Sequence, residues 1–222
     1  MLYESMRAVV PPVARVIWRP VVDGLENVPD EGPVILASNH LSFADSVVIP
    51  VVAPRRVVFL AKEEYFTRPG VRGRLARSWY TALGAVPVNR DDTRSALGSL
   101  NTALEILRQG DALGLYPEGT RSRDGRLYRG RTGVAQLALM SGAPIVPVGL
   151  IGTDRLQPVG SRLPRLARIE VRFGAPIHPG DEYDGMAPGR ARRDLTDRVM
   201  ATIQELSGQE AAGVYNERPA DG

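Results

Sequence analysis

Short apolar runs bounded by turn-forming residues recur along this 222-residue chain and constrain its fold more than any other feature. The first run is Pro33–Ser38, and similar runs follow at 56–61, 85–89, 112–116 and 145–151. Runs of this length are typical of buried strands. Helical patterns lie between them, the clearest over 92–109, with one apolar face formed by Leu97, Leu100, Leu104 and Leu107. Strands that alternate with helices predict an α/β fold with a mostly parallel sheet flanked by helices.

Two further patterns complete the predicted fold. Residues 168–173 alternate between polar and apolar, which indicates a half-exposed strand that is antiparallel or at an edge, so the sheet is expected to be mixed. Near the C-terminus, a helical pattern closed by Gly208 is formed by Leu195, Val199, Ile203 and Leu206.

The length suits a single domain, which we place at 25–208 between two smaller segments. Residues 1–24 combine many valines with Trp18 and several arginines and are broken by Pro11 and Pro12, which predicts short amphipathic helices. Trp and Arg on an apolar element favour attachment to a membrane interface. The alternative is a helix packed on the domain's own core. Residues 209–222 are polar, so a flexible tail is expected there.

Composition excludes several classes of function. Cysteine is absent, which rules out disulfides and thiolate chemistry and suits a reducing compartment. No run approaches the length of a membrane-spanning helix, and no secretory signal or nucleic-acid-binding motif occurs. Nucleic-acid binding is therefore not expected. The second of the two histidines, His178, lies in a Pro- and Gly-rich loop, so no metal site is expected either. The pI near 9.5 fits phosphorylated substrates or an anionic membrane.

The pair His40 and Asp45 directly follows the first predicted strand. In a regular helix, residues five apart do not share a face, so His40 must precede the helix that contains Asp45. From the first turn of that helix, the carboxylate can reach back to the imidazole and fix its tautomer. The histidine is then a general base for a substrate hydroxyl. A structural histidine near a helix cap is the alternative.

Two later strands end in arginine-bearing segments. Gly84–Arg90 presents Arg90, and Leu115–Ser122 presents Arg121 in a loop with Gly119. A guanidinium forms paired hydrogen bonds with phosphate, and glycine lets backbone N–H groups approach an anion. The two loops together predict a phosphate clamp, whereas each arginine alone is equally compatible with a solvated surface charge.

These segments, together with Ala143–Val148, resemble the four ordered motifs of the glycerophospholipid acyltransferase family, in its lysophosphatidic acid acyltransferase branch. The resemblance covers about residues 33–148. It implies an O-acyltransferase of phospholipid biosynthesis that moves a fatty acyl group from acyl-CoA or acyl-carrier protein. The implied acceptor is a free hydroxyl of lysophosphatidic acid (1-acylglycerol-3-phosphate) or glycerol-3-phosphate. No cofactor is implied beyond the thioester co-substrate, and the implied location is the cytoplasmic face of the membrane, with peripheral or monotopic attachment.

The resemblance also implies roles for individual residues. His40 is the catalytic base and Asp45 its orienting acid, and the residues assigned to the acceptor phosphate are Lys62, Arg90, Glu118, Gly119, Thr120 and Arg121. Lys62 is the only lysine in the chain. The second motif departs from the family pattern at Pro87, which removes a backbone donor and favours an edge strand or a bulge.

Other functions stay open at this point. One alternative is an acyltransferase for another lyso-lipid or a glycolipid, and another is a lipid- or phosphate-binding protein without turnover, for which no base is needed. A phosphoester hydrolase that uses His40 would require a metal cluster or a second catalytic histidine, and neither is visible in the sequence.

Overall fold

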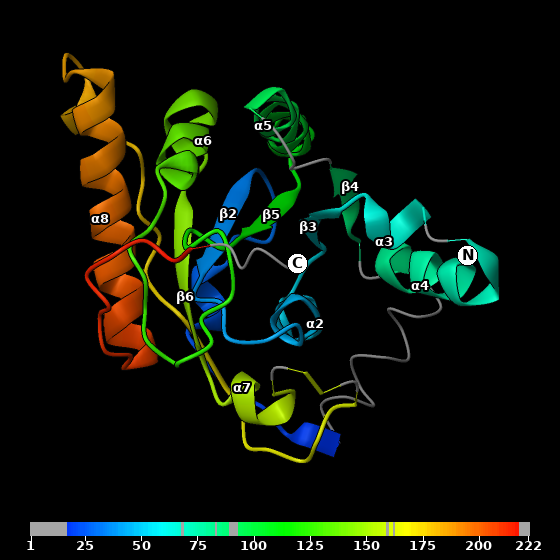
Figure 1. Cartoon of the computed structure of the whole chain (residues 1–222). Helices are drawn as coiled ribbons and strands as arrows, with labels where there is room; N and C mark the ends of the chain where they lie inside the picture. Colours follow the sequence, from blue (N-terminus) through cyan, green and yellow to red (C-terminus); the bar gives the residue numbers. More distant parts are fainter. Residues whose placement is uncertain are drawn as a thin grey trace.

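A computed structural model describes residues 17–67, 69–82, 84–88, 93–158, 160–161 and 163–217. Its centre is a seven-stranded sheet in the order β1-β7-β6-β2-β5-β3-β4, flanked by helices (Figure 1). The five strands that carry the sequence motifs run parallel to one another: β2 (Val34–Ser38), β3 (Val57–Lys62), β4 (Val86–Val88), β5 (Ala112–Leu115) and β6 (Ile145–Ile151). β7 (Glu170–Phe173) pairs antiparallel with β6, and β1 (Val21–Asp23) pairs with β7. The sheet is therefore mixed.

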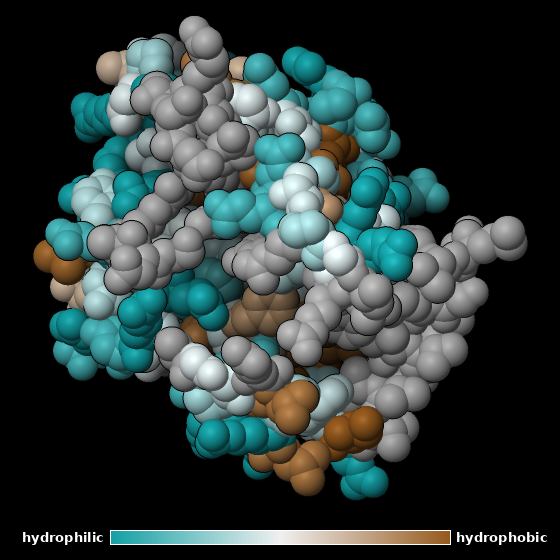
Figure 2. All heavy atoms as spheres, turned by 45° about the vertical axis from the view of Figure 1, so that its right-hand side comes forward, coloured by the Kyte–Doolittle hydropathy of each residue, from teal (hydrophilic) through white to brown (hydrophobic). Residues whose placement is uncertain are grey.

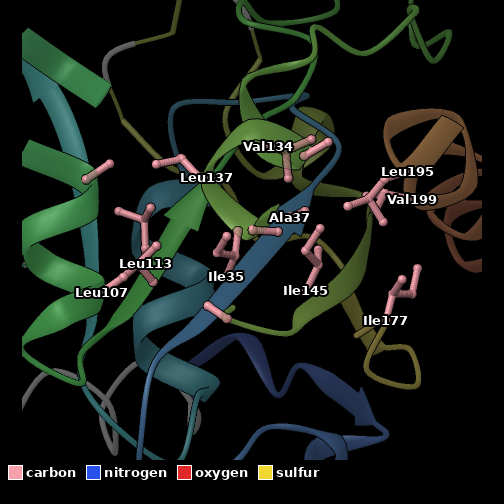
Figure 3. Close-up of a cluster of buried hydrophobic side chains, with 14 of the residues drawn as sticks. Ile35, Ala37, Leu107, Leu113, Val134, Leu137, Ile145, Ile177, Leu195 and Val199 are labelled. Carbon is pink, nitrogen blue, oxygen red and sulfur yellow. The ribbon is translucent and has the colours of Figure 1, made fainter. Parts of the chain in front are cut away.

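One face of the sheet is covered by three helices: α5 (Thr93–Arg108), α6 (Gly133–Ser141) and α8 (Pro188–Ser207). A cluster of buried apolar side chains lies between the sheet and these helices. It includes Ile35 and Ala37 of β2, Leu137 of α6 and Leu195 of α8 (Figure 3). Alternate residues of a strand point to opposite faces, so Val34 and Leu36 enter the second cluster.

The second cluster lies beneath α2 (Asp45–Val52) and α7 (Thr153–Leu156). Two further helices, α3 (Glu64–Thr67) and α4 (Gly70–Ala82), lie near the β3–β4 end of the sheet (Figure 1). Two 3₁₀ turns, Leu25–Asn27 and Asp181–Tyr183, complete the described elements. Because apolar cores lie on both faces, the central strands are buried along most of their length, as their continuous apolar runs predicted.

The predicted α/β fold with a mixed, mostly parallel sheet is confirmed. β4 is an edge strand, which explains how it accommodates Pro87 without losing a ladder hydrogen bond to a second neighbour. Gly208 ends α8 in the left-handed conformation, with φ 70°, as the sequence indicated. Among the described residues, no helix has both the length and the apolar character needed to cross a bilayer.

The predicted segment boundaries need two corrections. Val21 and Val22, assigned to the amphipathic helical segment 1–24, belong to the strand β1, because their backbones pair with Val171 and its neighbours. Trp18 packs against the second apolar cluster, and its Nε1 donates to the carbonyl of Arg165 at 3.1 Å. The remaining part of that segment, residues 1–16, lies outside the described residues.

The second correction concerns the tail. Residues 209–217, expected to be flexible, are held against the domain; we call them the C-terminal strap. Leu127 donates its backbone N–H to the carbonyl of Glu210 and accepts from Ala212, and Arg129 donates to the carbonyl of Val214. Backbone hydrogen bonds require no apolar side chains, so the polar composition of the strap gave no sign of them.

Candidate active site

The parallel strands β2, β5, β6, β3 and β4 all end at one edge of the sheet, and the loops that follow β2 and β5 meet there. Ser122 donates its backbone N–H to the carbonyl of His40 at 2.8 Å. His40 donates its own backbone N–H to Oε1 of Glu118 at 2.9 Å. The histidine loop is thus attached to the Glu118–Ser122 loop through both backbone polar groups of His40, at the edge where ligands bind in open α/β sheets.

His40 and Asp45 form the predicted pair. His40 lies in the loop before α2, and Asp45 is the first residue of that helix. Nδ1 of His40 lies 2.8 Å from Oδ2 of Asp45, and the same oxygen accepts from the backbone N–H groups of Leu41 and Ser42 at 2.7 and 2.8 Å. Asp45 is fully buried and lies at the positive end of the helix dipole. A carboxylate can only accept, so Nδ1 carries the proton and Nε2 is left as the free base.

An aromatic stack fixes the plane of the imidazole. The ring of Tyr116 lies 3.8 Å from that of His40 at an angle of 7°, and the ring of Phe59 also stacks with Tyr116, at 5.4 Å. Any side chain at Gly114 would collide with the Phe59 ring, so this strand position needs glycine. The hydroxyl of Tyr116 is 2.9 Å from Oγ of Ser46.

Burial, and next the negative charge of Asp45, hold the pKa of Tyr116 well above its ordinary value, so its ring stays neutral beside the base. Tyr116 can then support His40 through ring contact without contributing a charge that competes with Asp45.

Glu118 has a different role from the predicted one. Its side chain is fully buried, with Oε1 bound to the N–H of His40 and Oε2 to the N–H of Tyr128 at 2.9 Å. A carboxylate with both oxygens buried in this way does not contact a phosphate, and its charge would repel one. Desolvation raises the pKa of Glu118 from 4.5 to about 7, against the lowering effect of the two backbone hydrogen bonds. Glu118 therefore holds the His40 loop in place.

The rest of the predicted phosphate loop is open to solvent. Gly119 has φ +80°, a conformation that favours glycine, and it is exposed together with the side chain of Arg121, while Thr120 is half-buried. Lys62 is the last residue of β3 and so ends at the same edge of the sheet. Arg90 lies outside the described residues.

Comparison with known proteins places this geometry in a family. The family model described as Acyltransferase matches residues 19–151, a span that contains β2 to β6 and the whole His40 and Glu118 arrangement. The chain belongs to the acyltransferase family.

Individual relatives of this chain were found among characterised proteins. It is 33% identical over 160 residues to the 1-acyl-sn-glycerol-3-phosphate acyltransferase LPAT1 of Arabidopsis thaliana chloroplasts, covering 71% of this chain and 43% of that protein. The enzyme of that name from Bacillus subtilis (strain 168) is 28% identical over 186 residues, or 83% of this chain and 86% of that protein. The chain spans only 39% to 51% of the length of three plant relatives.

A solved structure is also similar: the 1-acyl-sn-glycerophosphate acyltransferase PlsC from Thermotoga maritima. It superimposes with a TM-score of 0.66 at 26% identity, covering 91% of this chain and 82% of that chain. The likeness extends well beyond residues 33–148, on which the sequence motifs lie, and it includes the helical and strand layers around them.

Several residues of this candidate site escaped the sequence analysis. Tyr116 was placed in a predicted strand without a role, although an aromatic residue at a strand end beside the motif edge is a usable signal. Asn39 is fully buried and bonds both backbone groups of Leu150, which ties the His40 loop to β6. Its Nδ2 also donates to Oε1 of Gln209 at 2.7 Å. No local pattern indicates that last contact, because 170 residues separate the partners.

Proposed function

We propose that this chain transfers a fatty acyl group from a thioester, acyl-CoA or acyl-carrier protein, to a hydroxyl of lysophosphatidic acid. One observation carries the proposal. Asp45 is held by two backbone N–H groups and lies against Nδ1 of His40, which leaves Nε2 of His40 free as a base. Relatives that share this family are 1-acyl-sn-glycerol-3-phosphate acyltransferases by name, which supports the acceptor. Glycerol-3-phosphate is the second acceptor to test.

The proposed chemistry needs no enzyme nucleophile. The acceptor hydroxyl gives its proton to Nε2 of His40 as its oxygen attacks the thioester carbonyl, and the new C–O bond forms a tetrahedral intermediate. Collapse of that intermediate breaks the C–S bond, and the leaving sulfur takes the proton back from Nε2. Asp45 stabilises the imidazolium between these two steps, as the acid of a Ser-His-Asp triad does. The thioester is the co-substrate, and we propose no cofactor or metal; the described residues contain no group of three or more potential metal ligands of the His, Cys, Asp or Glu type.

The acceptor is tested by comparing three hydroxyl compounds. Thiol release from a long-chain acyl-CoA is measured with lysophosphatidic acid, with glycerol-3-phosphate and with a phosphate-free monoacylglycerol. Acyl-carrier protein thioester is run in parallel as donor. The proposal expects the phosphate-free compound to be the slowest acceptor. Equal rates with and without phosphate would remove the phosphate clamp from the account, and no thiol release with any acceptor would contradict the activity itself.

We further propose that the protein works at a membrane surface, on the cytoplasmic face, where a chain without cysteine suits the reducing compartment. Large apolar side chains are exposed close to the active-site edge: Ile17 (49%), Leu163 (76%) and Leu166 (82%). The bond from Trp18 to Arg165 joins these two segments, and Ser42 bonds the carbonyl of Gln157 next to them. Figure 2 shows apolar (brown) atoms gathered along its lower edge, the end of the molecule where Figure 1 places α7 and β1.

Sedimentation with vesicles tests this surface. Leu163→Ser combined with Leu166→Ser is expected to reduce binding to vesicles that contain an anionic phospholipid, because these leucines would insert among the lipids. Leu97→Ser is the matched control, since Leu97 is 59% exposed on α5, away from the lower edge in Figure 1. Equal sedimentation of the double variant and the control would contradict a membrane role for this surface.

A further inference from the structure

Arg131 lies directly against the open glycine of the Glu118–Ser122 loop. The nearest atoms to a side chain built at Gly119 would be Nε and Cδ of Arg131, at 3.0 and 3.1 Å. The backbone N–H of Arg131 donates to the carbonyl of Pro117 at 2.8 Å, which holds the residue to the same turn. The guanidinium therefore lies beside the loop in which Glu118 anchors His40. In the sequence, Arg131 follows the predicted phosphate-binding residues of that loop by ten residues or more.

The charge of Arg131 is not neutralised within the part of the chain that the structure describes. Neighbouring arginines form ion pairs, such as Arg126 with Asp124 and Arg193 with Asp197. No ion pair joins Arg131 or Arg121 to a carboxylate of the described residues. A guanidinium that lies in a site loop without a counter-ion has its donors available to an anionic ligand.

The C-terminal strap determines where this guanidinium lies. Nη2 of Arg131 donates to the carbonyl of Asn216 at 3.2 Å, and Cζ of Arg131 lies 5.8 Å from the centre of the Tyr215 ring. The hydroxyl of Tyr215 accepts in turn from Arg193 at 3.1 Å, and the amide of Asn216 donates to the carbonyl of Arg121 at 3.1 Å. The strap thus contacts the guanidinium of Arg131 and the backbone of Arg121, and through Gln209 it also reaches Asn39 beside His40.

We propose that Arg131 is a further binding residue for the anionic group of the acceptor, next to Arg121, and that Tyr215 is the positioning residue that orients it. This inference rests on the proposed function for the presence of a phosphate on the acceptor. Arg131 contributes hydrogen bonds to phosphate oxygens, whereas Tyr215 touches only the arginine. The strap is then part of the acceptor site, although it is remote from the motifs in sequence.

Steady-state kinetics with lysophosphatidic acid separate Arg131 from its neighbours. Arg131→Gln is expected to raise the acceptor KM about tenfold, as the loss of a charge-assisted hydrogen bond does, while kcat changes less than about twofold. The matched control is Arg129→Gln, because Arg129 also lies over the Tyr215 ring, at 5.2 Å. The atoms nearest to a side chain built at Gly119 belong to Arg131 and not to Arg129. The control removes the same charge and is expected to leave KM nearly unchanged.

Tyr215 variants test the positioning role. Tyr215→Ala is expected to raise KM about threefold at constant kcat, through loss of the ring under Arg131. Tyr215→Phe keeps the ring, so its KM is expected to equal that of the wild type, although it loses the hydrogen bond to Arg193. A purely structural role would instead lower the melting temperature of Tyr215→Ala without changing its KM.

Equilibrium binding of lysophosphatidic acid, measured by calorimetry, separates failure of this inference from failure of the proposed activity. Weaker binding to Arg131→Gln than to Arg129→Gln supports the site even where the wild type releases no thiol. Equal binding and equal KM for these two variants, with the wild type active, would overturn the role of Arg131 and leave the proposed acyltransfer intact.

Discussion

The His40 loop lies beside the region that carries Arg121 and Arg131, which we call the arginine loop, at one edge of the sheet. The two regions differ in where their polar groups find partners. Around His40, the protein supplies the partners itself: Asp45 Oδ2 accepts three hydrogen bonds, and both oxygens of Glu118 accept from backbone N–H groups. Around Arg121 and Arg131, the guanidinium groups have no described carboxylate partner. The first region is fixed before substrate arrives, and the second keeps its donors for a ligand.

This difference predicts that changes in the two regions affect different kinetic constants. Substitutions in the His40 loop should lower kcat or stability, because they disturb a pre-organised base. Substitutions in the arginine loop should raise the acceptor KM, because they remove contacts that form only with substrate.

After loss of the base itself, the largest effect is expected for Asp45→Asn. The amide oxygen can keep the three hydrogen bonds that Oδ2 accepts, but the variant loses the negative charge that stabilises the imidazolium and places an NH2 group at the buried position of Oδ1. We expect kcat to fall about a thousandfold, with acceptor binding preserved. Measured thiol release within about tenfold of the wild type would show that the charge of Asp45 does not support the base.

Glu118→Gln addresses stability as a function of pH. The pKa of Glu118 is about 7 in the folded chain and 4.5 ordinarily, so the unfolded chain loses this proton first as pH rises. The free energy of unfolding should therefore fall between pH 4.5 and about 7, by up to about 3 kcal/mol, and the contribution should be fully present below this window.

The glutamine variant cannot titrate, so it should lack this part of the slope. Urea unfolding of both proteins across the window measures the difference. Parallel curves for the two proteins would mean that Glu118 has the same pKa in the folded and the unfolded chain, so that burial has little effect on it.

Gly114→Ala tests the aromatic stack. The added methyl would collide with Phe59, and we expect a loss of about 2 kcal/mol in stability together with a lower kcat as Tyr116 shifts under His40. Gly98→Ala on α5 is the matched control, because a side chain there meets no atom within 4 Å. A neutral result at Gly114 would show that the ring stack is not needed to hold the base.

The smallest of these effects is expected for Arg121→Ala. We expect about a tenfold rise in the acceptor KM, equivalent to about 1.4 kcal/mol, with kcat within about twofold of the wild type. The phosphate-free monoacylglycerol should show no such rise, and kinetics with both acceptors measure this. A fall in kcat with unchanged KM would place Arg121 with the base rather than with the acceptor.

The sequence predicted the parts of the molecule whose signals are local. The strands β2, β3, β5 and β6 are buried on both faces and therefore appear as continuous apolar runs, and the spacing of His40 and Asp45 placed the histidine before a helix. β1 was missed because three residues between an arginine-rich segment and a turn carry too little periodicity to separate strand from helix.

Contacts between distant segments were beyond the sequence. Glu118 beside Arg121 was interpreted as part of a phosphate site, but whether a carboxylate faces solvent or a neighbouring loop depends on how β2 and β5 pair. The strap was interpreted as flexible because its polar side chains gave no sign of its backbone bonds to Leu127 and Arg129. Both errors concern hydrogen bonds to backbone groups, which have no side-chain signature.

The central claim is that His40 acts as the base while its surroundings hold it ready. The most direct measurement is thiol release from long-chain acyl-CoA with lysophosphatidic acid by the wild type and by His40→Ala, alongside the melting temperature and acceptor binding of both. The account predicts that the variant loses at least about a thousandfold in kcat while it folds and binds the acceptor normally. Turnover by a folded His40→Ala protein at a rate close to that of the wild type would contradict it.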